Sequence, residues 1–205
     1  MRFLPSGSTS FLVELDDLDE VLALYGALEE RRPQGVVDLV PAARTLLVVT
    51  DPEVTTLAAA RDVVAATRPR PGRRAAGEQV EVPVTYDGQD LDDVAELLGC
   101  DADEVVRRHT CQEWLVVFCG FAPGFGYLTS TTGGWDVPRR STPRTKVPAG
   151  AVALAGEFSG VYPRESPGGW QLIGRAHVAA FDLAREPAAL LRPGVQVRFV
   201  DVGSR

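Results

Sequence analysis

Residues 118–128 read FCGFAPGFGYL and join the end of an apolar run to a glycine-rich loop. The apolar run, residues 114–118, has the length and the β-branched and aromatic content of a buried strand. The loop interleaves aromatic rings with residues that break a regular strand: Gly120, Phe121, Pro123, Gly124, Phe125, Gly126 and Tyr127. Because glycine allows close backbone approach and aromatic rings form rigid walls, this stretch predicts one side of a ligand or partner cleft. The alternative is a tight turn that caps a barrel.

The sequence around this stretch is typical of short strands separated by turns. Strands are expected at residues 79–86 and 195–202 and in the segments AVALAG, GVYP and GWQLIG, with glycine or proline at nearly every junction. Between residues 79–86 and the central loop, Asp90 and Asp101 are expected to cap two short helices, at residues 91–98 and 102–108. This part of the chain therefore predicts a closed β-barrel.

The N-terminal part predicts a small α+β layer in the order ββαββα. Strands are expected at residues 2–4, 9–15, 36–40 and 45–50. The first helix begins after Asp16 or Asp17, and Asp51 with Pro52 predicts the start of a second helix that runs to about residue 67. Neither helix carries a polar cluster on its apolar stripe, so both are interpreted as scaffold.

Residues 68–77, RPRPGRRAAG, form the predicted linker because they are rich in proline, glycine and arginine and lack apolar periodicity. The four arginines could form an anion-binding patch or a solvated basic linker, and no site is assigned there. The predicted domains are residues 1–77, an α+β unit, and residues 78–205, a β-barrel unit.

Composition excludes several classes of protein. Acidic residues outnumber basic residues by 28 to 21, for a formal charge of −7, which argues against a nucleic-acid or anionic-membrane binder. No apolar run approaches the ~18 residues of a membrane-spanning helix, and a cytoplasmic protein is expected. Three cysteines and two histidines, without a C-x-x-C pair, indicate neither a disulfide framework nor a metal site. A P-loop and a G-x-S-x-G elbow are both absent.

Two groups of polar residues are candidates for chemistry. His109 lies where the second short helix ends, directly before the central strand, and is either a helix-terminal cation or a proton acceptor and substrate anchor. Residues 137–150 then concentrate four basic side chains among prolines: Arg139, Arg140, Arg144 and Lys146. These cations could bind a carboxylate or phosphate, or could pair with acidic side chains of the protein.

Three strings carry a resemblance to a known family: GFAPGFGYL at residues 120–128, PRR-x-x-PR-x-x-VPAG at residues 138–150, and YPRESPGGWQLIGR at residues 162–175. The chain resembles the KipI/PxpB family, which is also called allophanate hydrolase subunit 1 and is similar to the carboxyltransferase region of urea carboxylase. The resemblance covers essentially the whole chain. It implies a small N-terminal α+β sandwich followed by a cyclophilin-like β-barrel.

The resemblance implies the B subunit of a bacterial ATP-dependent 5-oxoprolinase. Together with the C subunit, which is of the allophanate hydrolase subunit 2 type, it would activate 5-oxoproline, and the A subunit would complete hydrolysis to glutamate. ATP and Mg²⁺ are implied for the complex, while the chain shows no evident motif for either and is expected to be inactive alone. The resemblance leaves open a KipI-like inhibitor that binds a sensor histidine kinase, or a carboxyltransferase-type subunit of a urea or allophanate enzyme.

The resemblance also implies roles for individual residues. His109 and Arg144 are the predicted catalytic residues. The predicted substrate-binding residues form the aromatic loop, the basic segment and the later glycine turn: Phe121, Pro123, Gly124, Phe125, Tyr127, Arg139, Lys146, Pro148, Arg164, Gly168 and Gly169. Three positions depart from the family pattern: Gly126 stands where proline is usual, Ala151 replaces serine, and Phe158 with Ser159 replaces a Gln-Thr pair. Phe158 removes an amide donor and acceptor beside the expected cleft.

Overall fold

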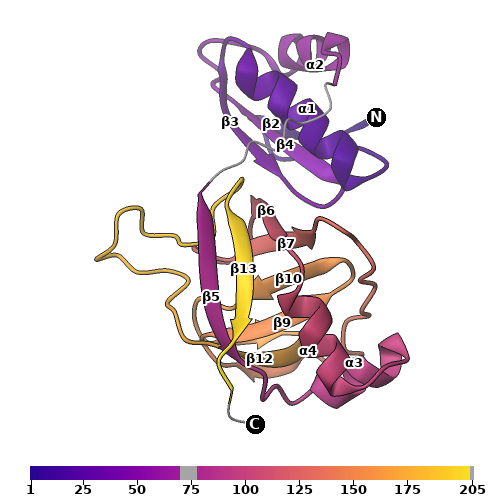
Figure 1. Ribbon diagram of the computed structural model, residues 1–205. Coiled ribbons are helices and arrows are strands. Elements are labelled where there is room, and N and C mark those ends of the chain that lie inside the picture. The colour runs from indigo at the N-terminus through magenta and orange to yellow at the C-terminus, as the bar shows by residue number, and fades with distance from the viewer. Residues whose placement is uncertain (70–77, 204–205) are drawn as a thin grey trace. The chain divides into compact units, whose positions relative to one another are not determined.

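The computed structural model describes residues 1–69 and 78–203 of the 205-residue chain. The chain divides into two compact units, Met1–Arg74 and Ala75–Arg205 (Figure 1). Most of the predicted linker, residues 70–77, lies outside the described residues, and the proposed boundary at residues 77 and 78 stays a prediction.

The N-terminal unit is a four-stranded antiparallel sheet with two helices, in the strand order β1-β2-β4-β3. The elements are β1 (Arg2–Pro5), β2 (Ser10–Glu14), α1 (Leu18–Glu30), β3 (Val36–Pro41), β4 (Thr45–Thr50) and α2 (Leu57–Ala66). Apolar side chains alternate along β2 and β4, and those on the buried side pack with the apolar stripes of both helices around Leu24, Leu46 and Val64. Every buried member of this core lies between residues 11 and 64.

One of the two helix caps predicted for this unit is confirmed and the other is wrong. Asp17 caps α1, as predicted, because its side chain accepts a hydrogen bond from the Glu20 backbone N–H at 2.9 Å. The prediction that Asp51 begins the second helix is wrong. Asp51 instead holds a turn by accepting from the Glu53 backbone N–H at 2.9 Å, and Thr56 caps α2 five residues later.

The second unit is built on a seven-stranded closed barrel in the order β10-β7-β6-β13-β5-β12-β9, closed by the pairing of β9 with β10. Its strands are β5 (Gln79–Thr85), β6 (Trp114–Cys119), β7 (Gly126–Ser130), β9 (Ala151–Ala155), β10 (Phe158–Val161), β12 (Gln171–Ala176) and β13 (Gln196–Asp201). Strands β5 and β13 pair in parallel, and the other neighbours in the barrel are antiparallel. A separate two-stranded sheet consists of β8 (Arg144–Val147) and β11 (Ser166–Gly168).

Two helices, α3 (Leu91–Leu98) and α4 (Ala102–Thr110), precede the central strand β6. Asp101 caps α4, as predicted, by accepting from the Glu104 backbone N–H at 2.7 Å. Asp90 occupies the N-cap position of α3, as predicted, but its side chain makes no bond to the helix. The buried faces of both helices join the apolar cluster that fills the barrel.

Alternation along the strands divides the barrel unit into two apolar layers. Every barrel strand contributes to the interior cluster; on β9 its members are Val152 and Leu154. Ala151, Ala153 and Ala155 of the same strand belong to a second cluster on the outer face, together with Val147 of β8. The predicted fold class, a small α+β unit followed by a β-barrel, is confirmed.

None of the helices in residues 1–69 and 78–203 has the length and apolar content needed to cross a membrane.

Candidate functional site

The loop between β6 and β7 is a tight turn that leaves one aromatic ring in solvent. Backbone bonds run from Gly120 N–H to the Phe125 carbonyl at 3.2 Å and from Phe125 N–H to the Ala122 carbonyl at 3.0 Å. Phe121 has φ +67° and is the only non-glycine with positive φ among the described residues, and its side chain is 59% exposed. A bulky residue in this strained conformation is held there by its surroundings and often marks a functional site. The tight turn predicted from the sequence describes this geometry, and the part of the loop in the wall of a cleft stays a prediction.

Aromatic rings from the turn and from neighbouring elements form a contiguous group on the outer face of the barrel. This outer aromatic cluster consists of Phe118, Phe121, Phe125, Tyr127, Phe158, Tyr162 and Trp170. Phe125 is its centre, buried, with ring centroids 5.2 Å from Tyr162, 5.3 Å from Trp170 and 5.1 Å from Tyr127 in edge-to-face arrangements. Such pairs add to the energy of area burial and fix the ring orientations, so the cluster forms a rigid wall.

Two of the predicted glycines allow aromatic residues to pack closely against the backbone. A Cβ at Gly168 would lie 2.4 Å from the Tyr162 hydroxyl oxygen. A Cβ at Gly124, which has φ +81°, would lie 2.5 Å from Cβ of Phe181. Both positions therefore require glycine, because atoms of neighbouring aromatic residues occupy the space of a side chain.

The basic side chains near this wall differ in their partners. Arg140 and Arg144 both bind the carboxylate of Asp90 at 2.7 Å, and Lys146 pairs with Glu165 at 3.1 Å on the surface. Arg139 and Arg164 are exposed and form no hydrogen bond or ion pair with any residue of the described ranges. Pairing, the alternative to ligand binding for the basic segment, thus applies to Arg140, Arg144 and Lys146 and not to Arg139.

The electrostatics of two phenols place Arg139 beside the wall. Burial raises the pKa of Tyr127, and the positive charge of Arg139 opposes that rise. Burial likewise raises the pKa of Tyr162, against the charges of Arg139 and Arg144. Both hydroxyls therefore remain protonated hydrogen-bond donors at neutral pH, next to cationic groups.

His109 lies away from this wall, in the barrel interior, and is fully buried. Its Nδ1 lies 2.7 Å from the Tyr86 hydroxyl oxygen and its Nε2 lies 2.9 Å from Oγ of Ser159. Burial lowers its pKa to about 3, because the charged imidazolium would lose its hydration. The ring is therefore neutral at physiological pH, and the alternative of a helix-terminal cation is wrong.

Nearly the whole chain matches one protein family. The family described as carboxyltransferase domain, subdomain C and D, matches residues 1–191. The chain belongs to this family. Among curated relatives of this carboxyltransferase-domain chain are the B subunits of 5-oxoprolinase from Escherichia coli O157:H7, 48% identical over 59% of this chain, and from Bacillus subtilis (strain 168), 43% identical over 62%. The matches cover 57% and 54% of those proteins, so the chain aligns with little more than half of their length.

Solved structures of the same architecture include longer chains. TTHA0988 is 36% identical with a TM-score of 0.76, and the match covers 96% of this chain and 40% of that one. The conserved uncharacterized protein PH0987 from Pyrococcus horikoshii is 34% identical, with a TM-score of 0.59 and coverage of 99% and 98%. Kluyveromyces lactis urea carboxylase, at 18% identity, shares the fold over 98% of this chain and 22% of its own, with a TM-score of 0.74.

In this carboxyltransferase-domain chain the predicted site residues fall into two groups. One group lies in or around the outer aromatic cluster: Phe121, Phe125, Tyr127, Arg139 and Arg144. Two predicted glycines connect to the basic segment through the backbone. Gly168 pairs with Arg144 between β11 and β8, and the Gly169 carbonyl accepts from the Arg140 backbone N–H at 2.8 Å. Pro123, Pro148 and Arg164 are exposed residues of the same segments, and Lys146 lies on β8. Of the predicted site residues, His109 packs in the barrel interior, against Trp114 and Phe199. A hollow lined by residues of β5, β13 and the end of α4 contains no predicted site residue.

Sequence reasoning missed three residues of the candidate site. Tyr162 and Trp170 supply two rings of the aromatic wall, and both lie in the string YPRESPGGWQLIGR, which already marked the region. Asp90 was interpreted as a helix cap, and nothing near it in the sequence indicates a bond to arginines at least 50 residues away.

The departures from the family pattern gain a structural context. Phe158 packs on Tyr127 with ring centroids 5.6 Å apart, so the expected amide is replaced by another ring of the aromatic wall. Ser159, the next residue, faces inward and bonds His109. A Cβ at Gly126 would lie 2.9 Å from Cβ of Leu191, so in this chain the residue permits close packing of β7 on the segment before β13.

Proposed function

We propose that this chain is the B-type component of an ATP-dependent 5-oxoprolinase and that the outer aromatic cluster with its arginines is its contribution to the substrate site. Support for the activity comes from the curated relatives, which are named as B subunits of 5-oxoprolinase and are 42–48% identical. The observation on the molecule that carries the proposal is Arg139, which is exposed, has no partner among the described residues and acts on the phenols of the aromatic wall in a chain of net charge −7. Arg164, which is also exposed and without a partner in the described ranges, follows Tyr162 by two residues.

The chemistry of 5-oxoproline requires both parts of this site. Its lactam is a poor electrophile, and phosphorylation of the lactam oxygen by ATP would turn that oxygen into a leaving group. The substrate carboxylate and the phosphate both need cations, which Arg139, Arg144 and Arg164 can provide as guanidinium forks. The rings of Phe121 and Tyr127 would pack against the small lactam ring and exclude water.

His109 takes part in this proposal through β10. Neither the ring nor its partner Ser159 has exposed surface, so the predicted part of His109 in proton transfer or substrate placement would be indirect, through its bond to β10. Ser159 is flanked by Phe158, which belongs to the aromatic wall, and by Gly160, which packs closely against Phe125 and Trp170. We therefore propose that His109 sets the position of β10 beneath the wall.

The proposed enzyme would need two further proteins, homologues of the A and C subunits of 5-oxoprolinase. We propose that this chain has no turnover alone, because the aromatic wall and the exposed arginines form only one side of a site. Assembly with the C-type component would cover the exposed ring of Phe121 and enclose the substrate.

The test is 5-oxoproline-dependent ATP hydrolysis by the chain alone and by the chain co-expressed with A-type and C-type homologues. We expect turnover only in the assembled mixture. Arg139→Ala and Arg164→Ala should each lower kcat/KM by about tenfold or more, equivalent to about 1.4 kcal/mol. Arg198→Ala is the matched control, because Arg198 is likewise exposed and pairs only loosely with Glu81 at 3.7 Å.

An intact wild-type complex without 5-oxoproline-dependent turnover would refute the proposal. Carboxyl transfer and inhibition of a histidine kinase would then be assayed. Turnover that survives both arginine substitutions would keep the activity and remove the outer aromatic cluster as its site.

A further inference from the structure

Asp90 stands at the start of α3 and is buried, with its side chain 2% exposed. A buried aspartate in this position ordinarily caps the helix, yet Asp90 has φ −109° and ψ 10° and its carboxylate makes no bond to the first turn. Its backbone N–H donates to the Leu172 carbonyl at 2.9 Å, which ties this point of the chain to β12. The side chain is thereby free to face away from the helix.

Three donors converge on the Asp90 carboxylate. Oδ1 accepts from Nη1 of Arg140 and from Nη2 of Arg144, each at 2.7 Å. Oδ2 accepts from the Leu172 backbone N–H, also at 2.7 Å. One carboxylate between two guanidinium groups leaves a single net positive charge, which lies next to the segment that carries Arg139.

The second arginine exceeds what a structural ion pair needs. One guanidinium would neutralise Asp90, and a buried pair already contributes little to stability after desolvation. Here Nε of Arg140 and Nη1 of Arg144 are additionally buried without a hydrogen-bond partner among the described residues, and each unsatisfied donor costs free energy. Stability alone does not account for this arrangement.

The arginine pair lies beside the aromatic wall. The charge of Arg144, with that of Arg139, counters the burial that raises the pKa of the Tyr162 phenol. Arg144 also pairs across β8 and β11 with Gly168, which packs against the Tyr162 hydroxyl. The side chain of Arg140 is 31% exposed, so this guanidinium keeps a surface that a ligand can reach.

We propose that Asp90 is a positioning residue that clamps Arg140 and Arg144 side by side, so that the pair receives one oxyanion of the substrate, a carboxylate or a phosphate. Arg140 thereby becomes an anion-binding residue of the site. The inference rests on the proposed function for the identity of the substrate. Its physical basis is that a fork fixed in advance binds an anion without the entropy cost of ordering two long side chains.

The experiment uses the assembled complex with Asp90→Asn, which keeps the shape of the side chain and removes its charge. We expect KM to rise at least tenfold for the substrate whose oxyanion is bound, with kcat changed less than threefold. A rise confined to the KM for 5-oxoproline identifies the carboxylate, and a rise confined to the KM for ATP identifies a phosphate. Arg140→Lys, which keeps the charge and loses the fork, should raise the same KM.

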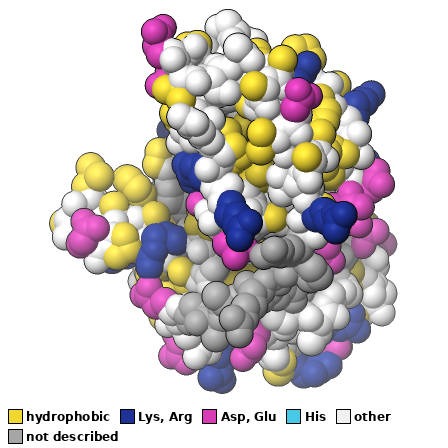
Figure 2. All heavy atoms as spheres, turned by 90° about the horizontal axis from the view of Figure 1, so that it is seen from above, with side chains coloured by type: hydrophobic (Ala, Val, Ile, Leu, Met, Phe, Trp, Pro, Cys, Tyr) yellow, Lys and Arg dark blue, Asp and Glu magenta, His cyan; other side chains and the backbone are white. Residues whose placement is uncertain are grey.

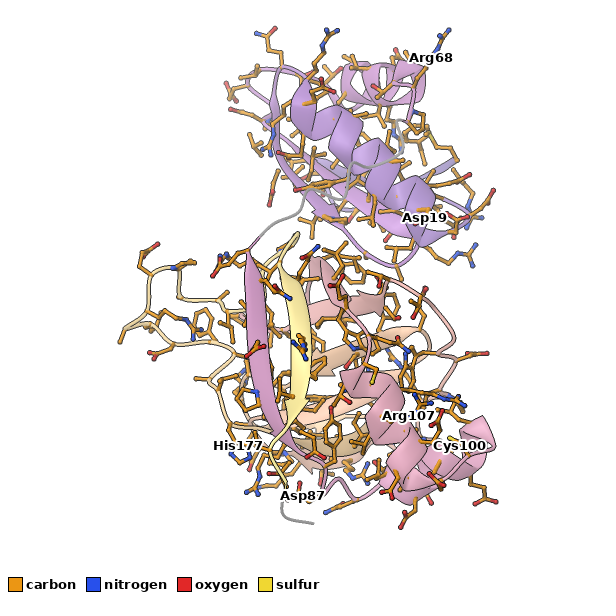
Figure 3. All side chains as sticks on the ribbon, viewed as in Figure 1. Asp19, Arg68, Asp87, Cys100, Arg107 and His177 are labelled. Atoms are coloured by element: carbon orange, nitrogen blue, oxygen red, sulfur yellow. The ribbon has the colours of Figure 1, made fainter. Side chains whose placement is uncertain are left out.

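Asp87→Asn is the matched control. Asp87, labelled in Figure 3, lies three residues before Asp90. It pairs with one exposed arginine, Arg175, at 3.2 Å. This variant should leave both KM values within twofold of the wild type. If Asp90 had only a structural role, Asp90→Asn would lower Tm but would not raise the KM for one substrate selectively.

Unchanged KM values in folded complexes of Asp90→Asn and Arg140→Lys would overturn the inference. If Asp90→Asn fails to fold, Arg140→Gln decides, because its side chain is partly exposed. Failure of the proposed function is recognised separately, as absent turnover in the wild type. The clamp is then tested on the chain alone with inorganic phosphate: the wild type should show a rise in Tm with phosphate that Arg140→Gln lacks, and equal shifts would overturn it.

Discussion

His109 lies in the last turn of α4, where a histidine is usually interpreted as a cation that complements the helix dipole. The structure turns this side chain inward, between the rings of Trp114 and Phe199, with centroid distances of 4.9 and 4.3 Å. Tyr86 and Ser159 satisfy both ring nitrogens, so the imidazole is buried without an unpaired polar atom. A group that is neutral when folded and charged when unfolded makes stability depend on pH.

The free energy of unfolding should fall as pH drops below about 6.5. The unfolded chain takes up a proton on His109 near its ordinary pKa of about 6.5, whereas the folded pKa is about 3, so protons favour the unfolded state between these values. The slope from this group approaches about 1.4 kcal/mol per pH unit. Urea unfolding at several values between pH 7.5 and 5.0 measures it.

His109→Gln should remove this slope, and His177→Gln, at the exposed histidine labelled in Figure 3, should retain it. Imidazole NMR provides a second reading that needs no substitution, because the His109 resonance should stay that of a neutral ring at pH 5. A His109 ring that protonates near pH 6.5 in the folded protein would contradict the buried position.

At the scale of elements, the two-stranded sheet β8 and β11 covers the aromatic side of the barrel. Val147 of β8 packs into the outer-face apolar cluster, and Trp170, two residues after β11, is buried against Phe125 and Tyr127. The small residues of β9, three alanines, leave room for these rings. The sheet that carries Arg144 and Lys146 is therefore held in place by side-chain packing rather than by strand pairing to the barrel.

Trp170→Ala should lower the free energy of unfolding by about 3 to 5 kcal/mol, the usual cost of deleting a large buried ring. Hydrogen exchange should accelerate first in β8 and β11, since they lose the packing that anchors them, while β6 and β13 stay protected. Phe121→Ala is the control, because that ring belongs to the same cluster and is 59% exposed; it should cost less than about 1 kcal/mol. Uniform loss of protection over the whole barrel would contradict this account.

At the scale of the molecule, the chain contains two separate sets of buried residues. The core of the first unit lies between residues 11 and 64, and both clusters of the barrel unit lie between residues 82 and 199. The segment from β12 to β13 stands out from the barrel in Figure 1, and Figure 2 shows hydrophobic side chains on it; Leu183 there is 86% exposed. Arg185 holds this segment by donating to four backbone carbonyls, those of Ala179, Ala180, Pro187 and Ala188.

Residues 78–205 should fold without the first unit, because no core residue of the barrel is contributed from residues 1–69. All three tryptophans, at positions 114, 135 and 170, lie in this fragment, so its near-UV circular dichroism in the tryptophan region should superimpose on that of the whole chain. Thermal unfolding should be cooperative. A fragment without near-UV signal would show that the barrel needs the first unit.

Local features of the fold could be predicted from the sequence, because they depend on neighbours within a few residues. The period-2 strands, the caps at Asp17 and Asp101 and the turn after β6 are of this kind, and they determined the order of an α+β unit and a barrel. The capping bonds expected from the side chains of Asp51 and Asp90 are not formed, because an aspartate before a helix has the same local sequence whichever partner it binds.

The tertiary structure alone decided which basic side chains pair with carboxylates and where the His109 ring lies. Asp90 meets Leu172, Arg140 and Arg144 across 82, 50 and 54 residues, because barrel closure brings β12 beside β5 and the helix that follows it. The sequence determined that a basic segment and an aromatic loop exist. Only the tertiary packing decided that His109 lies inside, because the buried face of α4 packs against Trp114 and Phe199 of the barrel, while Phe121 and Arg139 stay exposed in loops.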